Sequence, residues 1–222
     1  MRRLYHTPLS PYCRKVRLAL KEKGLEFELM QENPTNRNLN TFALDPAGEV
    51  PVLIEEDGTA VSGVYAIIEY LEEIYPQIIL LGGSTAERAE VRRLAGWFDH
   101  KFDYEVTQNI LFEKVFKHYS RGGEPNSSAI RLGQNNILYH LDYIGHLASV
   151  RTFLAGENLT LADLAAAAQL SALDYLGSVP WDYNPAARNW YALMKSRPSL
   201  RCISSERVRG VRPPVYYDNP DF

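Results

Sequence analysis

The stretch L-S-P-Y-C-R-K-V-R-L-A-L, residues 9–20, decides the fold. It places a hydroxyl and a thiol three residues apart, between a proline-flanked turn and a basic helix. Residues 3–7, before the turn, read as a short strand. The pattern after the turn predicts a helix from Tyr12 to Lys23. A strand, a proline turn and a helix therefore open the chain.

This first helix has one apolar face. Its members are Cys13, Val16, Ala19 and Leu20. The basic residues lie mostly off that face; they are Arg14, Lys15, Arg17 and Lys21. Because Cys13 shares the register of Val16 and Leu20, we interpret it as a small buried hydrophobe rather than a reactive thiol.

The next sixty residues continue an α/β pattern. Residues 25–30 alternate as a second strand, and residues 45–61 read as two strands joined by an Asp57-Gly58 turn. A helix is predicted from Ala66 to Ile74. The order is therefore βαβ, an irregular stretch, then ββα.

After Ser84 the pattern is helical almost throughout. We predict helices over 85–118, over 127–150, from Thr160 onward and over 185–196. The fold class is therefore α/β plus all-α. We place its parts by residue number: an α/β domain at 1–76, a linker at 77–84, a helical domain at 85–206 and an extended tail at 207–222.

Composition narrows the class of function. The chain has 222 residues and a net charge of −3, so it shows no strong bias toward nucleic acid or an anionic membrane. Its two cysteines, Cys13 and Cys202, are too few for a disulfide scaffold and are typical of a reducing cytoplasm. No secretory signal or membrane-spanning run is evident. No histidine spacing indicates a metal site. We expect a cytoplasmic protein that neither binds nucleic acid nor inserts into a membrane.

Four motifs together resemble the glutathione S-transferase superfamily over nearly the whole chain. They are S-P-Y-C-R-K-V-R-L-A-L at 10–20, D-P-A-G-E-V-P-V-L at 45–53, A-I-I-E-Y-L at 66–71 and T-L-A-D at 160–163. The resemblance implies a thioredoxin-like N-terminal domain followed by an all-helical glutathione-transferase C-terminal domain. It also implies a homodimer, with contacts near Val64, Tyr65 and Trp97.

The same resemblance implies a glutathione site. The Val50–Pro51 bond is expected to be cis, which turns the Val50 backbone toward the cysteinyl part of glutathione. Ser10 is the candidate for stabilising the glutathione thiolate, since a hydroxyl that faces sulfur favours the anion. The alternative for Ser10 is that it only caps the helix.

The stretch A-V-S-G-V-Y-A-I-I-E-Y-L, residues 60–71, departs from the superfamily pattern. Glutathione-binding members have an acid and a serine where this chain has Gly63 and Val64. Ser62 would replace that serine only after a two-residue shift in register. Charge-assisted hydrogen bonds contribute about 1.5–3 kcal/mol each, so their loss predicts weak or absent glutathione binding. The glutathione site at Val50, Pro51 and Val64 is therefore degenerate, and we expect no cofactor.

Two further patterns have structural interpretations. Thr160 and Asp163 form a capping box, which we favour over a catalytic role for the carboxylate. The aromatic residues Trp97, Phe98 and Phe102 are interpreted as core rather than as a binding site.

The last sixteen residues do not resemble a helix or a covered strand. Proline pairs favour an extended course, and aromatic residues between charges suit docking into a groove. The candidate partner-binding residues are Tyr216, Tyr217, Asp218, Asp221 and Phe222. The alternative is a tail folded back on its own domain.

The ending also resembles that of superfamily members that bind the bacterial division protein FtsZ. Our first hypothesis is a non-catalytic protein that binds FtsZ and is recruited to the division site. The alternative is a glutathione transferase that conjugates or reduces small electrophiles with Ser10, and with glutathione as cosubstrate. A thiol–disulfide reductase using Cys13 is the least favoured, because Ser10 replaces one cysteine of the pair.

Overall fold

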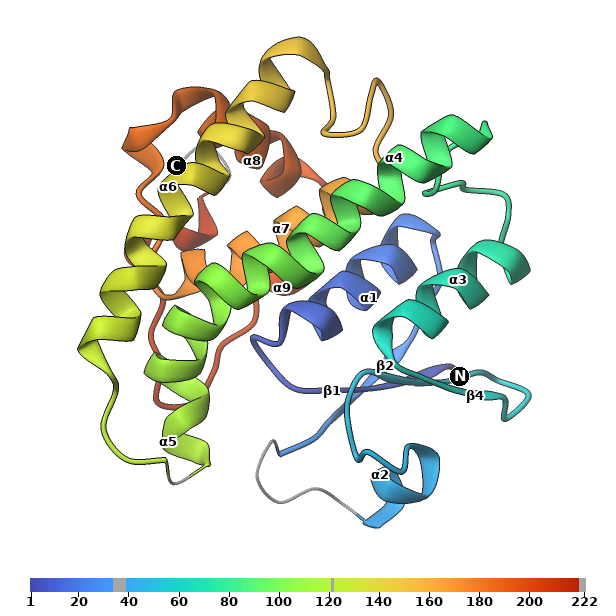
Figure 1. The fold of residues 1–222 in the computed structure, drawn as a ribbon. Helices are drawn as coiled ribbons and strands as arrows, with labels where there is room; N and C mark the ends of the chain where they lie inside the picture. The colour runs from blue at the N-terminus through green and yellow to red at the C-terminus, as the bar shows by residue number, and fades with distance from the viewer. Residues whose placement is uncertain (34–38, 121, 220–222) are drawn as a thin grey trace.

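A computed structural model describes residues 1–33, 39–120 and 122–219. It has a small α/β domain followed by a larger helical domain, as the fold class predicted (Figure 1). Within the described ranges, no helix has the length and apolar character needed to cross a membrane.

The N-terminal domain is built on a four-stranded mixed sheet. Its strands are β1 (Arg3–His6), β2 (Glu28–Gln31), β3 (Val52–Ile54) and β4 (Ala60–Ser62). The order is β2-β1-β3-β4, with β1 and β2 parallel and the other pairs antiparallel. Helices α1 (Pro11–Glu22) and α3 (Val64–Ile74) cover one face, and α2 (Leu39–Leu44) lies on the other side (Figure 1).

The C-terminal domain is helical. Its elements are α4 (Thr85–Gly96), η1 (Trp97–Phe116), α5 (Lys117–Tyr119), α6 (Ser127–Val150), α7 (Leu161–Tyr175), η2 (Trp181–Tyr183), α8 (Pro185–Ser196), α9 (Pro198–Ser204) and η3 (Val215–Asp218). Every residue of α7 is buried, so this helix is the centre of the domain. Its run of four alanines, 165–168, is wholly within the core.

The predicted helices over 127–150 and 185–196 are confirmed at both ends. The predicted helix over 85–118 corresponds to α4, η1 and α5 in unbroken succession. Its middle part, η1, is a π-helix, wider than an α-helix. Buried positions in η1 recur every four residues, at 98, 102, 106 and 110, which is longer than the α-helical period of 3.6.

Several elements differ from the prediction. Strand β3 begins at Val52, whereas the strand pair was predicted over residues 45–61. Strand β2 begins at Glu28 rather than at residue 25, and α3 begins at Val64 rather than at Ala66. The stretch predicted to be irregular contains the short helix α2. Helix α2 has 6 residues, which are too few to show a periodic pattern in the sequence.

Three of the four basic residues of α1 are buried, although they lie off its apolar face. Arg14, Lys15 and Arg17 are at most 3% exposed, because the C-terminal domain covers that side of the helix. Each has a carboxylate partner from that domain. Lys15 pairs with Asp99 at 2.5 Å, and both arginines pair with Glu206. These buried cations therefore hold the two domains together.

The linker is also packed. Leu80 and Leu81 are 2% exposed, and the backbone N–H of Leu161 donates to the Leu80 carbonyl at 2.9 Å. The segment between α3 and α4 is thus anchored to the first turn of α7.

The predicted capping box at the start of α7 is confirmed. The Thr160 hydroxyl accepts from the Ala162 N–H, and the Asp163 carboxylate accepts from the Thr160 N–H at 2.9 Å. Asp163 is fully buried and also accepts from Leu154 and Trp190. Its contacts are structural.

The three aromatic residues that were predicted to be core, Trp97, Phe98 and Phe102, pack in or against the core. Phe98 and Phe102 are fully buried, and Trp97 is partly buried against the same core.

Candidate functional site

A cavity of about 260 Å³ lies where the turn before α1 meets the start of β3 and the end of η1. Among the predicted site residues, Ser10 and Val50 line it. The Val50–Pro51 bond that precedes β3 is cis, as the resemblance implied. Ser10 and Val50 therefore line one cavity, next to the cis bond.

Ser10 caps α1. It is the N-cap residue, and its hydroxyl accepts from the Cys13 N–H at 3.4 Å. The structure thus shows the cap, and Ser10 also lines the cavity.

Cys13 is fully buried and does not line the cavity. Burial raises the pKa of its thiol, which keeps it in the unreactive protonated form. The interpretation of Cys13 as a small hydrophobe is confirmed.

The start of α3 lies outside the cavity. Gly63 is the N-cap residue, has φ +86° and provides no side-chain cap, and Val64 is 7% exposed. Neither lines the cavity. The acid and hydroxyl that would hold the γ-glutamyl end of glutathione are therefore absent from this position.

Ser62 does not replace the missing hydroxyl. It is the last residue of β4 and lies opposite Val52 in the β3–β4 pairing. A two-residue shift would move β4 out of this pairing, since register is set by the whole ladder. The pairing therefore holds Ser62 in the strand.

Tyr12 is a cavity residue that the sequence reasoning missed. Its hydroxyl donates to the Asp99 carbonyl at 2.8 Å. Burial, together with the charges of Asp103 and Asp99, raises the pKa of this phenol. Tyr12 therefore stays protonated and serves as a contact between the domains.

The charge of the cavity differs from that expected for an anion site. Two carboxylate residues, Glu32 and Glu49, line it, and no Lys or Arg does so among the described residues. Glutathione carries two carboxylates and one ammonium group. Coulomb repulsion from Glu32 and Glu49 would therefore oppose its binding.

The rest of the lining comes from segments far apart in the chain. Thr41 is fully buried there, and Phe116 comes from the end of η1. No local motif marks such residues, so only the tertiary structure identifies them. Nowhere in the described part of the chain do three or more His, Cys, Asp or Glu side chains gather in a way that would hold a metal ion.

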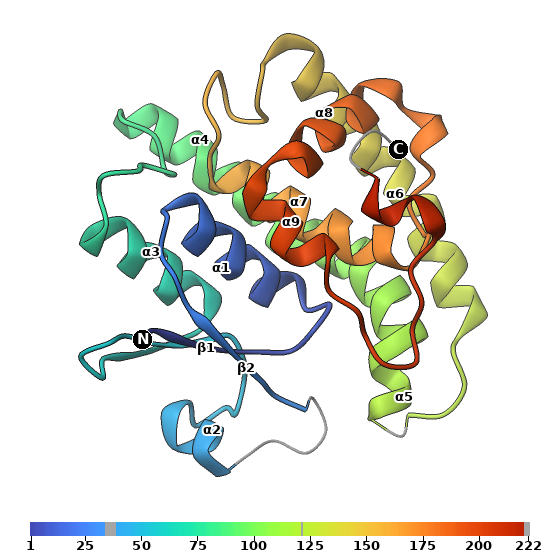
Figure 2. The same ribbon diagram turned by 180° about the vertical axis from the view of Figure 1, so that it is seen from behind.

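The C-terminal segment is folded back on its own domain. It descends from α9 to the level of α5 and returns to η3 (Figure 2). Tyr217 is 2% exposed and packs edge-on against Tyr175, with ring centroids 5.1 Å apart. The expectation of an extended tail with Tyr217 as a free anchor is corrected, because this ring fills a place in the core.

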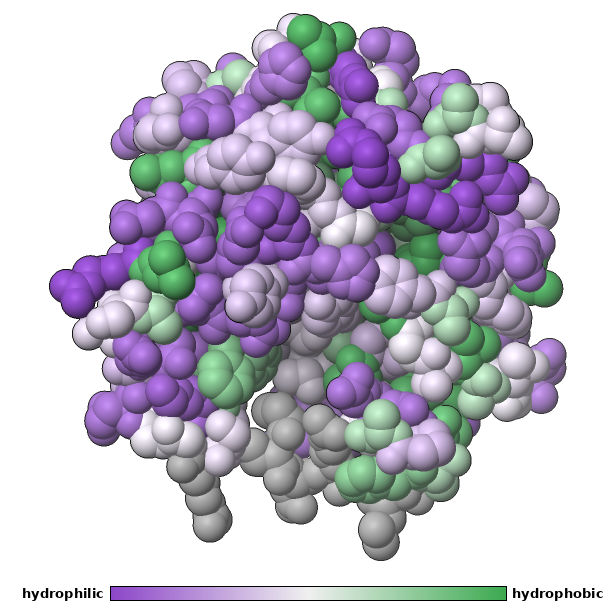
Figure 3. All heavy atoms as spheres, in the orientation of Figure 1, coloured by the Kyte–Doolittle hydropathy of each residue, from purple (hydrophilic) through white to green (hydrophobic). Residues whose placement is uncertain are grey.

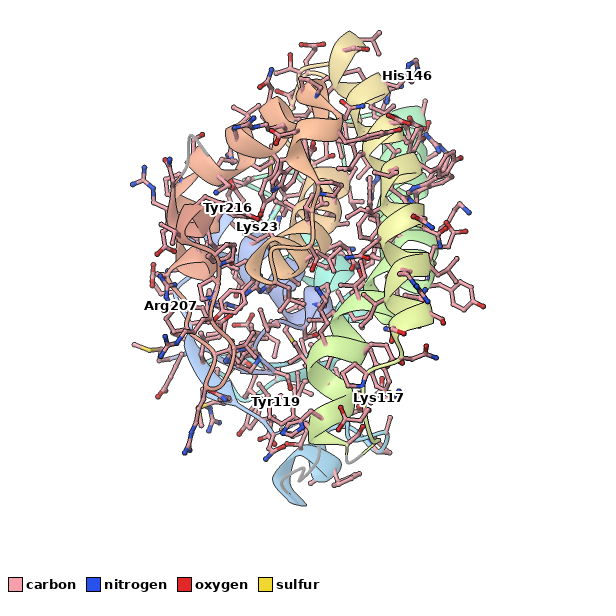
Figure 4. All side chains as sticks on the ribbon, turned by 90° about the vertical axis from the view of Figure 1, so that its left-hand side faces the viewer. Lys23, Lys117, Tyr119, His146, Arg207 and Tyr216 are labelled. Atoms are coloured by element: carbon pink, nitrogen blue, oxygen red, sulfur yellow. The ribbon has the colours of Figure 1, made fainter. Side chains whose placement is uncertain are left out.

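The other candidate partner-binding residues differ in exposure. Tyr216 is half-buried, and Asp218 is exposed and paired with Arg207. Arg207 and Tyr216 lie along the same edge of the molecule (Figure 4). Asp221 and Phe222 lie outside the described residues.

Comparison with known proteins supports the resemblance. A family model of the glutathione S-transferase N-terminal domain matches residues 4–78. FtsZ-localized protein A of Caulobacter vibrioides is 45% identical over an alignment that covers 100% of this chain and 98% of that protein.

Solved structures extend the similarity to the whole fold. The structure of FzlA from C. crescentus is 45% identical, with a TM-score of 0.96, and the match covers 100% of this chain and 99% of that one. A structure named as a glutathione S-transferase from Rhodospirillum rubrum F11 is 52% identical, with a TM-score of 0.98 and full coverage of both chains.

Proposed function

Because this chain belongs to the glutathione S-transferase superfamily, we propose that it is a non-catalytic member that binds FtsZ and regulates bacterial cell division. The observation that carries the proposal is the 45% identity to FtsZ-localized protein A across the full chain. Recruitment to the division site in the cytoplasm follows from such binding.

The degenerate glutathione site supports this choice over an enzyme. Gly63 and Val64 lack the groups that hold the γ-glutamyl end, and Glu32 and Glu49 repel carboxylates. Protein binding requires none of these groups. In this proposal the fold provides a surface that binds a protein partner.

The decisive experiment is co-sedimentation with FtsZ polymerised by GTP. We expect the purified chain to pellet with the polymers and to stay in the supernatant when GDP replaces GTP. Ser10→Ala should pellet like the wild type, because binding to FtsZ does not use the cavity. A chain that remains in the supernatant at micromolar concentrations of both proteins contradicts the proposal.

The second candidate is a glutathione transferase with Ser10 as the thiolate-stabilising group. It is favoured by the retained cis Pro51, by the position of Ser10 in the cavity and by the similarity to the Rhodospirillum rubrum structure. Calorimetric titration with glutathione distinguishes the two. Sub-millimolar binding and conjugation that Ser10→Ala abolishes would establish the enzyme.

Our proposal for the contact with FtsZ includes the C-terminal segment 213–222. Of the candidate partner-binding residues, the accessible described ones are Tyr216, which is half-buried, and Asp218, and we include Asp221 and Phe222 beyond them. Removal of residues 220–222 should weaken pelleting with FtsZ and leave the melting temperature unchanged. Tyr217→Ala should instead lower stability by about 3 kcal/mol, as expected for loss of a buried aromatic ring.

We also propose a homodimer. The face that includes α3 and η1 carries exposed aromatic residues, among them Tyr65, whose hydroxyl contacts the His100 ring at 2.9 Å. Trp97 lies 4.7 Å from Tyr143, ring centroid to ring centroid. On the side seen in Figure 1, the surface is mostly hydrophilic, with small and separate hydrophobic groups (Figure 3). We therefore propose that an interface on this face is formed by individual aromatic side chains rather than by one large apolar patch.

Light scattering of the purified protein tests the dimer. A mass of two chains is expected at micromolar concentration, and Trp97→Asp should shift it to one chain. A wild-type mass of one chain would count against the dimer without affecting the proposed binding of FtsZ.

A further inference from the structure

A second and larger cavity, of about 830 Å³, lies beside the first. We call it the tail groove. Its walls come from three parts of the chain: residues 7–8 and 31–33 of the N-terminal domain, residues 114–116 and 118–119 at the end of the long helix, and residues 208–211 of the C-terminal segment. Figure 4 views this side of the molecule, where Tyr119 faces the C-terminal segment and its hydroxyl donates to the Arg209 carbonyl.

The tail groove has a positive character. Its two cations are Lys114 on one wall and Arg209 on another. Among the described lining residues, Glu32 is the one carboxylate. The whole chain has a net charge of −3, so the groove is locally opposite in sign to the protein.

The cations that line the groove differ from nearby cations outside it, which form ion pairs with carboxylates. Lys117 pairs with Glu113 at 2.8 Å, and Arg207 pairs with Asp218. Lys114 instead donates to the hydroxyl of Ser178 at 2.9 Å, and neither it nor Arg209 has an ion pair among the described residues. Two cations on different walls are therefore available to an incoming carboxylate.

The same groove has apolar surface. Phe116, Val208 and Val211 are partly buried residues that line the groove and pack on the core. A ligand that fits must therefore offer both carboxylates and apolar groups. A polypeptide segment in which acidic and apolar residues alternate has both.

We propose that the tail groove binds an acidic peptide segment with apolar side chains, supplied by a protein partner. The inference rests on the proposed function in one respect: the occupant is part of a protein rather than a small molecule. The carboxylates pair with Lys114 and Arg209, and the apolar side chains pack on Phe116, Val208 and Val211. Charges at the rim speed the encounter and make binding dependent on salt.

The test uses fluorescein-labelled ten-residue peptides in which Glu alternates with Leu or Phe, measured by fluorescence anisotropy. Matched peptides have Gln or Lys in place of Glu. We expect the Glu peptide to bind at least tenfold more tightly than the Gln peptide, and the Lys peptide not to bind. Raising NaCl from 50 to 300 mM should weaken the Glu peptide several-fold. Equal affinity of the Glu and Gln peptides would overturn the proposal.

Two charge reversals locate the site. Lys114→Glu and Arg209→Glu should each weaken the Glu peptide about tenfold, whereas the exposed Arg201→Glu, which makes the same change in net charge outside the groove, should not. Lys114→Gln and Arg209→Gln give a milder loss if a reversal affects folding. Equal weakening by Arg201→Glu means a general charge effect and contradicts the groove.

Two further measurements separate the possibilities. If free N-acetylglutamate at peptide concentration competes as well as the peptide, the groove is a small-anion site and the proposal fails. If the peptides fail to bind while the chain still pellets with FtsZ, the inference is wrong and the proposed function stands. If peptide binding is present and pelleting with FtsZ is absent, the proposed function fails alone.

Discussion

The starts of helices α7 and α3 show how differently one fold treats two helix N-termini. At α7, the buried Asp163 carboxylate accepts four hydrogen bonds, from Leu154, Trp190 and both the N–H and the hydroxyl of Thr160. At α3, Gly63 provides no side-chain cap, and the first turn has no acid.

Solvent explains the difference. Asp163 is 0% exposed, so the N–H groups around it have no water to bond and depend on this carboxylate. Gly63 is exposed, and water can satisfy the N–H groups at the start of α3. Loss of polar side chains at α3 therefore weakens ligand binding with little cost to the fold, whereas the same loss at α7 would damage the fold itself.

The largest effect is expected from Asp163→Ala. Several buried donors would lose their acceptor, so the free energy of unfolding should fall by about 4 kcal/mol, measured by urea denaturation. Asp163→Asn keeps one acceptor oxygen and should lose less. A loss below about 1 kcal/mol for the alanine variant would mean that the two helix starts do not differ as described.

The second prediction restores to the start of α3 the acid and the hydroxyl that it lacks. Gly63→Glu with Val64→Ser should tighten glutathione binding about tenfold or more, because each charge-assisted bond contributes roughly 1.5–3 kcal/mol. The positive φ at Gly63 would strain a glutamate by roughly 1–2 kcal/mol. Val64→Ser alone is the unstrained control, and calorimetry is the measurement. Unchanged affinity in both variants would mean that Glu32 and Glu49, rather than α3, exclude glutathione.

A smaller loss of stability is expected when only the Thr160 hydroxyl is removed from the capping box of α7. Thr160→Ala should lower the free energy of unfolding by about 1 kcal/mol, and Thr160→Ser should lower it less because the hydroxyl remains. Thermal or urea unfolding of the three proteins measures this. If Ser and Ala variants are equally unstable, packing of the Thr160 methyl group matters more than capping.

The smallest effect belongs to the exposed capping box at α4. Its Glu87 carboxylate accepts from the N–H groups of Ser84 and Gly83, which lowers its pKa from the usual value. A carboxylate with a lowered pKa in the folded state contributes stability above its unfolded pKa, and this contribution is lost as pH falls through the folded value. Wild type should therefore lose stability relative to Glu87→Gln between pH 6 and pH 3. Parallel profiles would show that this exposed box contributes nothing measurable.

Local patterns predicted much of the fold. The Asp57-Gly58 turn, the capping box at Thr160 and the helix over 185–196 each depend on residues close together in the chain. The burial of Arg14 was not predictable, because its partners Ser171 and Glu206 lie 157 and 192 residues away.

The candidate site was predicted in part for the same reason. Ser10 and Val50 belong to short motifs, and the structure places both in one cavity. Tyr12 and Phe116 reach that cavity through the packing of the two domains, which no single motif encodes. The sequence predicts Tyr217 as a partner-binding residue, because nothing in its proline-rich surroundings indicates the Tyr175 ring that packs against it.

The ion pairs between α1 and Glu206 can form only late in translation, because Glu206 lies near the end of the chain. The described hydrogen bonds of the Arg14 guanidinium go to Ser171, Glu206 and Tyr217, all of which leave the ribosome long after α1. At about 5–20 residues per second, the 192 residues between Arg14 and Glu206 take roughly 10–40 s to translate. During that interval Arg14 and Arg17 of the nascent N-terminal domain lack the Glu206 carboxylate that pairs with both of them.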